Sequence, residues 1–315
     1  MKKFIKSLLA KRLEKYEITW QNKQDKLKLI LGKQLCFLQK QANISNLKET
    51  DFSIFSQFGE DGIINYLTEK IPIENKFFIE FGIENYNEAS TRFLMMNKNW
   101  GGLVMDGSEK NICYVKKREY FWRNDLTAIS RFITKENINS IINKMLTELA
   151  VNPDIGLLSI DIDGVDYWVL KEINCIEPVI IVCEYNSVFG NKTPLTVPYD
   201  EKFIRGNYHY SNLYWGANLK SFEIMLNQRG YIYVGSNVQN NIAFFVKKGI
   251  VEKHIPDLIQ NSDDNFEPTK VRESRDASGR LNYLRGGDRL KEIKDLELLN
   301  LQTNRLVKIK ELLLL

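Results

Sequence analysis

The sequence predicts an α/β fold of the Rossmann-like kind, in which helices cover a mostly parallel sheet that closes with a C-terminal antiparallel hairpin. From residue 77 onward, apolar runs of strand length alternate with segments of helical periodicity, which is typical of a parallel sheet with crossover helices. Two last apolar runs, 231–235 and 242–247, flank the short polar stretch 236–241 and predict the hairpin.

The elements follow in order along the chain. Strands are expected at 77–82, 103–106, 155–161 and 179–184, with one more within 118–126, and helices at 91–99, 135–150 and 218–228. Before the first strand, the segment 56–63 is dense in polar residues. It is either a packed helix whose polar end reaches the site or a plain helix start, with Ser56 as the cap and Glu60 in the first turn.

The composition fits one large core. The chain has 315 residues, of which 43% are hydrophobic and 27% charged, and no apolar run is long enough to cross a membrane. Lys6 and Lys11 interrupt the first apolar stretch too early for a signal peptide. The four cysteines stand singly, which favours a reduced, cytoplasmic protein without zinc.

The first 50 residues differ from the rest in charge. They hold 12 Lys and Arg against 4 Asp and Glu, a net charge of +8, whereas the remaining residues hold 32 against 36. Residues 1–40 have helical periodicity, with an apolar stripe from Phe4 through Ile5 and Leu8 to Trp20. This helix either packs on its own domain with a solvated outer face, or contacts an anionic inner membrane or a protein partner. No basic-aromatic pattern runs through the body, so nucleic acid is not expected as a partner.

We therefore divide the chain into a basic amphipathic arm, 1–50, an α/β domain, 51–250, and a C-terminal extension, 251–315, packed on or following that domain.

Polar groups gather where the predicted strands end, which is where open α/β sheets bind ligands. These residues are Glu80, Gly82, Asp106, Asp161, Asp163, Glu184 and Asn186. Asp106 follows Gly82 by 24 residues, close to the interval at which an acid binds ribose hydroxyls in nucleoside-binding folds; alternatively, it caps the turn that it begins. The absence of a GxGxxG motif counts against NAD.

The segment 161–168 (DIDGVDYW) is the most specific local signal. Its three carboxylates repel one another unless a cation or hydrogen-bond donors lie between them. With Glu184 and Asn186 from the next strand, Asp161 and Asp163 offer oxygen ligands suited to Mg²⁺ or Mn²⁺. In the alternative interpretation, Asp161 or Asp163 binds substrate or the cofactor's amine and Asp166 caps the following helix.

The segment 185–215 is long, aromatic and without clear periodicity, and loops of this length are usually functional. His209 within it is the candidate general base, although a lone histidine is more often a structural hydrogen-bonding group.

Four segments carry a family resemblance: 56–63 (SQFGEDGI), 78–86 (FIEFGIENY), 158–168 (LSIDIDGVDYW) and 183–190 (CEYNSVFG). Together with 272–276 (RESRD), they resemble bacterial proteins similar to FkbM-type methyltransferases, which are often encoded among surface-polysaccharide genes. The likeness covers roughly residues 52–250, outside the basic arm.

This resemblance implies a Rossmann-like methyltransferase fold that binds S-adenosylmethionine through Glu80, Gly82, Asp106 and Asp161. The chain departs from the usual pattern where Glu84 and Tyr86 stand at glycine positions. Metal-dependent catechol-type enzymes take ligands at the positions of Asp161 or Asp163 and of Glu184 or Asn186.

The sequence therefore predicts a methyltransferase that acts on a sugar hydroxyl of a glycan precursor or sugar nucleotide, with Asp163 and His209 as catalytic candidates. Two alternatives remain: a methyltransferase-like scaffold without catalysis, and an NAD-dependent enzyme that modifies sugar nucleotides. We expect it in the cytoplasm, with the arm as a peripheral contact to the inner membrane in one interpretation.

Overall fold

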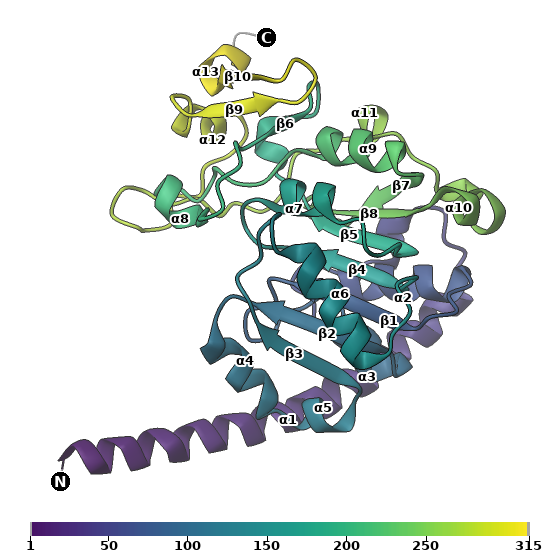
Figure 1. The fold of residues 1–315 in the computed structure, drawn as a ribbon, viewed down its shortest axis with the longest axis vertical. Helices are drawn as coiled ribbons and strands as arrows, with labels where there is room; N and C mark the ends of the chain where they lie inside the picture. The colour runs from purple at the N-terminus through teal and green to yellow at the C-terminus, as the bar shows by residue number, and fades with distance from the viewer. Residues whose placement is uncertain (1, 314–315) are drawn as a thin grey trace.

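A seven-stranded sheet forms the centre of the protein, in the order β3-β2-β1-β4-β5-β8-β7 (Figure 1). The computed structural model describes the backbone of residues 2–313 and the side chains of Leu9 and of residues 12–313. The first five strands pair in parallel, and β8 is antiparallel to both of its neighbours. The strands are β1 Phe77–Phe81, β2 Gly101–Asp106, β3 Leu126–Ser130, β4 Leu157–Ile160, β5 Ile180–Glu184, β7 Tyr231–Ser236 and β8 Ile242–Lys247. The predicted fold class is confirmed.

The third strand lies later in the chain than predicted. The segment expected to hold it forms helix α5 (Glu119–Arg123), and β3 begins only at Leu126. The aromatic run Tyr120–Trp122 favours a strand by composition. In the structure, however, the ring of Tyr120 packs against the guanidinium groups of Arg92 and Arg118, at 4.5 and 5.3 Å. Tertiary contacts therefore decide its conformation.

Helices cover both faces of the sheet. Alternate residues of β1 enter different cores: Phe77, Ile79 and Phe81 face one, and Phe78 faces the other, so the whole strand is buried. The first face is covered by α6 Ile138–Leu149, α7 Asp166–Glu172 and α9 Leu219–Gln228. The second is covered by α2 Glu60–Lys70, α3 Arg92–Lys98, α4 Glu109–Lys116, α5 and α10 Lys248–His254.

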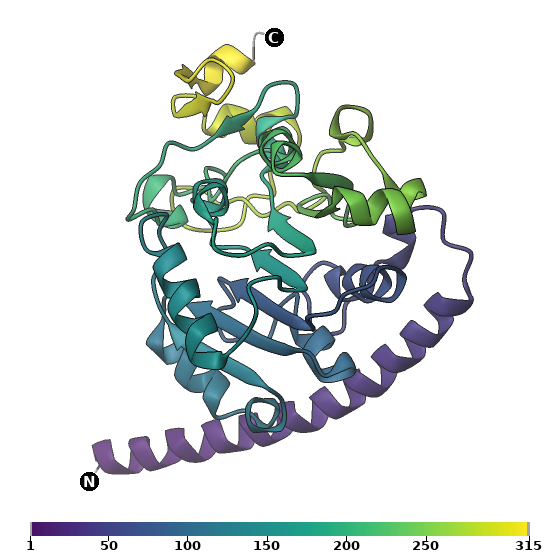
Figure 2. The same cartoon turned by 45° about the vertical axis from the view of Figure 1, so that its right-hand side comes forward.

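The arm is a single long helix, α1 (Lys2–Gln41), which runs along one side of the domain and projects beyond it (Figures 1 and 2). Its polar side faces the domain. The Asp25 carboxylate lies 2.5 Å from Arg92 Nη2 and 2.7 Å from Arg118 Nη2, and both arginines are fully buried. Gly32 permits close packing on α3, since a Cβ there would lie 2.4 Å from a ring carbon of Phe93.

The apolar stripe of the arm does not cover the core. Leu13 and Tyr16 are 68% and 73% exposed, and Leu9 and Trp20 are also exposed. The side chains of Phe4, Ile5 and Leu8, which begin the predicted stripe, lie outside the described residues. The helix thus packs on its own domain through the charged Asp25 and a small apolar contact that includes Cys36 and Leu29, with the described part of its predicted stripe outward.

The C-terminal residues form a second small sheet in the order β10-β9-β6, through which they join the segment after β5. Its strands are β6 Leu195–Thr196, β9 Glu297–Asn300 and β10 Arg305–Lys308. The remaining helices are α8 Arg205–Tyr208, α11 Ser262–Asn265, α12 Gly287–Glu292 and α13 Ile309–Leu312, with short 3-10 helices η1 Leu47–Thr50, η2 Ser187–Phe189 and η3 Pro256–Leu258. Among the described helices, none combines the length and apolarity needed to span a bilayer.

Candidate functional site

Two adjoining cavities lie at the carboxyl ends of the parallel strands. The larger, of about 470 Å³, is lined from the ends of β1, β4 and β5, and the smaller, of about 190 Å³, from the ends of β1, β2 and β4. Gly82, Glu84, Asp161 and Asp163 line both. This edge includes the switch point where the strand order turns from β1–β2 to β1–β4, the place where open α/β sheets bind ligands.

The loop after β1 has a glycine-like backbone built from larger residues. Gly82, Glu84 and Tyr86 have φ angles of +76°, +47° and +61°. Gly82 is required by packing, because a Cβ there would lie 1.5 Å from the Asp161 carbonyl oxygen. At Glu84 and Tyr86 the left-handed backbone costs about 1–2 kcal/mol per residue. The loop therefore keeps the conformation usual for glycines while placing the Glu84 side chain in the wall of both cavities.

Glu80 is held by the start of α3. Its Oε1 accepts a hydrogen bond from the Ser90 backbone N–H at 2.9 Å, and Oε2 accepts from the Thr91 N–H at 3.2 Å and from the Thr91 hydroxyl. Burial raises the pKa of Glu80 to about 7. Glu80 lines the larger cavity, but both of its oxygens bind the protein, so its contact with a cofactor stays a prediction.

Asp106 ends β2 and lines the smaller cavity. Its Oδ1 accepts from the Ser108 backbone N–H at 2.8 Å and from Asn111 Nδ2 at 3.0 Å, so the carboxylate does cap the turn. Both bonds use the same oxygen, so the cap does not depend on Oδ2. Turn capping and the binding of a ribose hydroxyl are therefore compatible at this residue.

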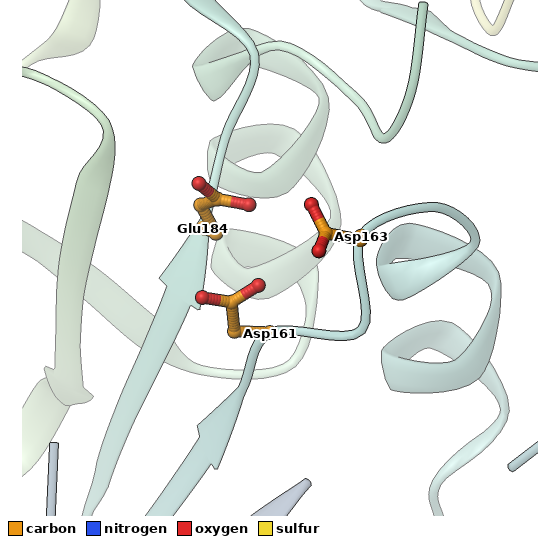
Figure 3. A group of neighbouring side chains, drawn as sticks. All are labelled: Asp161, Asp163 and Glu184. Carbon is orange, nitrogen blue, oxygen red and sulfur yellow. The ribbon is translucent and has the colours of Figure 1, made fainter. Parts of the chain in front are cut away.

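Three carboxylates converge beyond β4 and β5, as Figure 3 shows. Ile160 pairs with Cys183, so Asp161 and Glu184 follow side by side. One oxygen from each of Asp161, Asp163 and Glu184 lies within 4.8 Å of the others. Glu184 is 9% exposed, and its Oε2 has no hydrogen-bond partner within the described part of the chain. Burial, and then repulsion by the neighbouring carboxylates, raises the pKa of Asp161 and of Glu184 well above the usual values.

Asp166 and Asn186, which lie beside these carboxylates in the sequence, form hydrogen bonds that hold the backbone around the site. Asp166, the first residue of α7, accepts from the N–H groups of Ile162 and Gly164 at 2.7 and 2.9 Å and so fixes the turn that carries Asp163. Asn186 donates through Nδ2 to the carbonyls of Leu213 and Trp215, and its Oδ1 accepts from the Val188 N–H. Asn186 also lines the larger cavity, but its amide holds the backbone of the covering loops, and its role as a metal ligand stays a prediction.

His209 lines neither cavity. Its Nδ1 lies 2.7 Å from the Ser211 hydroxyl, and its ring packs on Tyr210 with the ring centres 4.3 Å apart. Burial lowers its pKa. These contacts are those of the structural alternative, and the role of His209 as general base stays a prediction.

Arg205 of α8 lies at the site, although the sequence did not indicate it as a site residue. Its Nη1 lies 2.5 Å from Asp163 Oδ1, its Nε donates to the Asn212 carbonyl at 2.8 Å, and its guanidinium lies 4.9 Å from the ring centre of Trp215. The ion pair holds Asp163 at the border of the two cavities.

Glu273 and Arg289, from the C-terminal extension, complete the wall of the larger cavity. Gln57 and Phe58, from the segment before α2, and Glu60, the first residue of α2, line it as well. The motifs 56–63 and 272–276 were the available signals for Glu60 and Glu273. Nothing in the sequence pattern pointed to Arg289. Both interpretations of segment 56–63 hold in part: Glu60, in the first turn of α2, lines the cavity, and Ser56 Oγ accepts from the Asp61 N–H at 3.1 Å, although Gly59 is the N-cap.

No protein-family model matches the chain, and comparison with curated protein sequences gave no match. Solved structures with a related arrangement include the O-methyltransferase from Bacillus cereus in complex with SAH, at 14% identity over 55% of this chain and 74% of that chain, with a TM-score of 0.34. An S-adenosylmethionine-dependent methyltransferase from Clostridium acetobutylicum has 11% identity over 60% and 90%, with a TM-score of 0.36.

Proposed function

We propose that the chain is an S-adenosylmethionine-dependent methyltransferase that methylates a sugar hydroxyl of a surface-glycan precursor. The observation that carries this proposal is the pair of adjoining cavities at the switch point, which meet at Gly82, Asp161 and Asp163. The smaller cavity, with Asp106 at the end of β2, suits a nucleoside. The larger one, rich in carboxylates and amides, suits the hydroxyl groups of a sugar.

The residues that line the two cavities then have the following roles. S-adenosylmethionine supplies a methyl group on a positively charged sulfur. Asp106 Oδ2 accepts from the ribose hydroxyls, and Phe132 and Ile133 in the wall of the smaller cavity pack against the base. Asp161 lies at the border of the two cavities and accepts a hydrogen bond from the amine of the cofactor. Glu184 accepts the proton of the acceptor hydroxyl, and Asp163, in the wall of the same cavity, orients that hydroxyl.

Calorimetric titration with S-adenosylhomocysteine tests the cofactor part. We expect a Kd in the micromolar range, about −8 kcal/mol. Asp106→Asn weakens binding by about 1.5–3 kcal/mol, since it removes a charged acceptor. Asp154→Asn, an exposed acid before β4, is the matched control and leaves the Kd unchanged. The absence of binding by the wild-type protein would contradict the proposal.

Mass spectrometry of the protein as purified separates the alternatives. Co-purified S-adenosylmethionine or S-adenosylhomocysteine supports the methyltransferase, NAD would support the sugar-nucleotide-modifying enzyme, and a protein that binds neither supports the scaffold. The missing GxGxxG motif makes NAD the weaker alternative.

A divalent cation, Mg²⁺ or Mn²⁺, at Asp161, Asp163 and Glu184 is the second part of the proposal. Three carboxylate oxygens suit these ions, and the buried, unpartnered Oε2 of Glu184 supports a cation there. Such an ion would increase the acidity of the acceptor hydroxyl.

Electron paramagnetic resonance of added Mn²⁺ tests this part. We expect the signal of the free ion to fall with the wild-type protein and with Asp154→Asn, but not with Asp161→Asn. An equal fall with all three proteins, or none, would assign the carboxylates to the cofactor and acceptor alone.

A further inference from the structure

Arg289 is a buried charge that has no ion-pair partner among the described residues. It lies on α12, is 9% exposed and lines the larger cavity. Its Nε has no hydrogen-bond partner among the described residues, and its Nη2 reaches only the Glu273 carbonyl, at 3.5 Å. The Glu273 carboxylate instead lies 3.2 Å from Arg275 and 4.0 Å from Arg205.

Packing does not explain such a residue. A buried guanidinium loses its hydration, and without a carboxylate it gains little in return, so an apolar side chain would be more stable in its place. The surroundings add to the cost, because burial and the nearby Arg205 lower the pKa of Arg289 by more than the Glu273 carboxylate raises it. Two guanidinium groups in one cavity wall, one of them unpaired, are the arrangement that binds oxyanions.

We infer that Arg289, assisted by Arg205, binds an anionic group of the acceptor, a carboxylate or a phosphate, in the larger cavity. The inference rests on the proposed function for the identity of the acceptor as a sugar, but anion binding itself does not need the methyl donor. The two kinds of charged residue in the cavity wall then have different roles. The carboxylates at the strand ends contact the reacting hydroxyl, and the arginines of α8 and α12 bind the anionic group of the acceptor.

Calorimetry with glucose 1-phosphate, glucuronate and uncharged glucose tests this inference. We expect one or both anions to bind and glucose to bind at least tenfold more weakly, since charge-assisted bonds are the stronger ones. The stronger of the two anions identifies phosphate or carboxylate as the recognised group. Binding should weaken with added NaCl.

Arg289→Gln should raise the Kd of the bound anion about tenfold or more, and Arg289→Lys should do so less. Arg285→Gln, an exposed arginine four residues earlier, is the matched control and should leave the Kd unchanged. The melting temperature separates binding from structure: removal of an unpaired buried charge should keep or raise it.

Two results would overturn the inference: neither anion binds the wild-type protein, or Arg289→Gln lowers the melting temperature and leaves the Kd of the anion unchanged. Failure of S-adenosylhomocysteine to bind would contradict the methyltransferase proposal alone. Arg289→Gln should leave the affinity for S-adenosylhomocysteine unchanged, because Arg289 does not line the smaller cavity.

A second, independent observation concerns the outer face of α1. Leu13, Tyr16, Trp20, Leu27 and Ile30 are more than half exposed and recur at intervals of three, four and seven, so they lie along one side of the helix. Leu31, Phe37 and Leu38 extend the same side. We call these eight residues the outer apolar face.

The positive charge of α1 indicates what kind of surface the outer apolar face contacts. The helix holds 11 Lys and Arg against 3 Asp and Glu, and Arg12, Lys15 and Lys23 are exposed near its N-terminal half. A second copy of the chain would bring an equal excess of positive charge against it. We propose that the outer apolar face lies on an anionic phospholipid surface, with its aromatic residues at the headgroup level and its lysines reaching the phosphates.

Sedimentation with vesicles of phosphatidylglycerol and phosphatidylcholine tests this proposal. The full chain should sediment at low salt and less in pure phosphatidylcholine or at high salt. The triple change Leu13→Ser, Tyr16→Ser and Trp20→Ser should abolish sedimentation without lowering the melting temperature. Trp122→Ser, at an exposed aromatic residue outside α1, is the control.

No sedimentation of the wild-type protein, or equal sedimentation of the triple variant, would overturn the membrane proposal. A wild-type dimer that the triple variant dissociates would also overturn it, in favour of a second copy. Deletion of the whole arm is a poor test, because it removes Asp25 from the buried Arg92 and Arg118.

Discussion

The Asp25 carboxylate of α1 lies 2.7 Å from the guanidinium of Arg118, a side chain that solvent does not reach. The same oxygen contacts Arg92, so one acid from the arm neutralises two buried arginines of the domain. The arm is thereby part of the folded unit, although its outer apolar face is exposed.

Asp25→Asn should lower the free energy of unfolding by about 3–5 kcal/mol, because it leaves two buried guanidinium groups without a counter-charge. Urea denaturation measures this change. Glu14→Gln is the matched control on the same helix: it removes an exposed pair with Lys117 and should cost less than about 1 kcal/mol. Equal effects of both changes would mean that α1 does not depend on the buried pair.

Gly82→Ala should be among the most destabilising small changes at the site. The new Cβ would lie 1.5 Å from the Asp161 carbonyl oxygen, so β1 and β4 must move apart where the two cavities meet. Gly230→Ala is the matched control, because its φ is +79° but no atom lies within 4 Å of its Cβ position. We expect a loss of about 1–2 kcal/mol for the control. Gly82→Ala should lose at least about 3 kcal/mol. Similar losses for the two variants would show that the positive φ angle, and not the contact with Asp161, is the reason for a glycine at position 82.

The sequence predicted the fold where the signal is local. Buried parallel strands have apolar runs such as FFIEF at 77–81, and these runs gave β1, β4 and β5 with small errors at their ends. The carboxylates at strand ends were predicted by the same logic, since strands in one sheet bring their carboxyl ends to one edge. β3 was misplaced because its neighbours Tyr120–Trp122 have strand composition but pack as a helix against two arginines.

What the sequence could not show about the site has a physical cause of a different kind. Arg205 and Arg289 lie in segments without periodicity, and only the tertiary fold brings them to the cavity. His209 was selected by chemistry, because few histidines occur in the chain, but no local pattern shows whether a ring faces a cavity or packs on Tyr210. Asn186 was placed correctly at a strand end, whereas its hydrogen bonds to the covering loops could not be read from the sequence.

The stability of the ligand-free protein should fall as the pH rises from 5 to 8. Burial raises the pKa of Glu60 and of Glu80 to about 7, above their ordinary value of 4.5. The folded state therefore holds these protons more tightly than the unfolded state, and the stabilisation is present at low pH and lost as the pH rises through 7. Each group contributes up to about 1.4 kcal/mol per pH unit between its two pKa values.

Urea denaturation at pH 5, 6, 7 and 8 in the presence of EDTA measures this dependence. Glu60→Gln should make it less steep, and Glu177→Gln, at an exposed residue, should leave it as in the wild-type protein. A wild-type protein that becomes more stable between pH 5 and pH 8 would contradict the raised pKa values.

Glu80→Gln distinguishes between two roles of Glu80: holding the start of α3 and contacting the cofactor. The structure shows both carboxylate oxygens accepting hydrogen bonds at the start of α3, so an amide there loses one acceptor and turns its own N–H groups toward donors. We expect a loss of about 1–2 kcal/mol in the free energy of unfolding at pH 8, in the range of a lost helix cap. The Kd of S-adenosylhomocysteine should change less than about threefold, since the bonds of Glu80 are made within the protein.

Asp106→Asn is the comparison variant for this test. It should show the reverse result: a weaker Kd for S-adenosylhomocysteine and little change in the free energy of unfolding. A tenfold weaker Kd for Glu80→Gln at unchanged stability would show that Glu80 contacts the cofactor, as the family resemblance implies, and that the contacts with Ser90 and Thr91 give way when the cofactor binds.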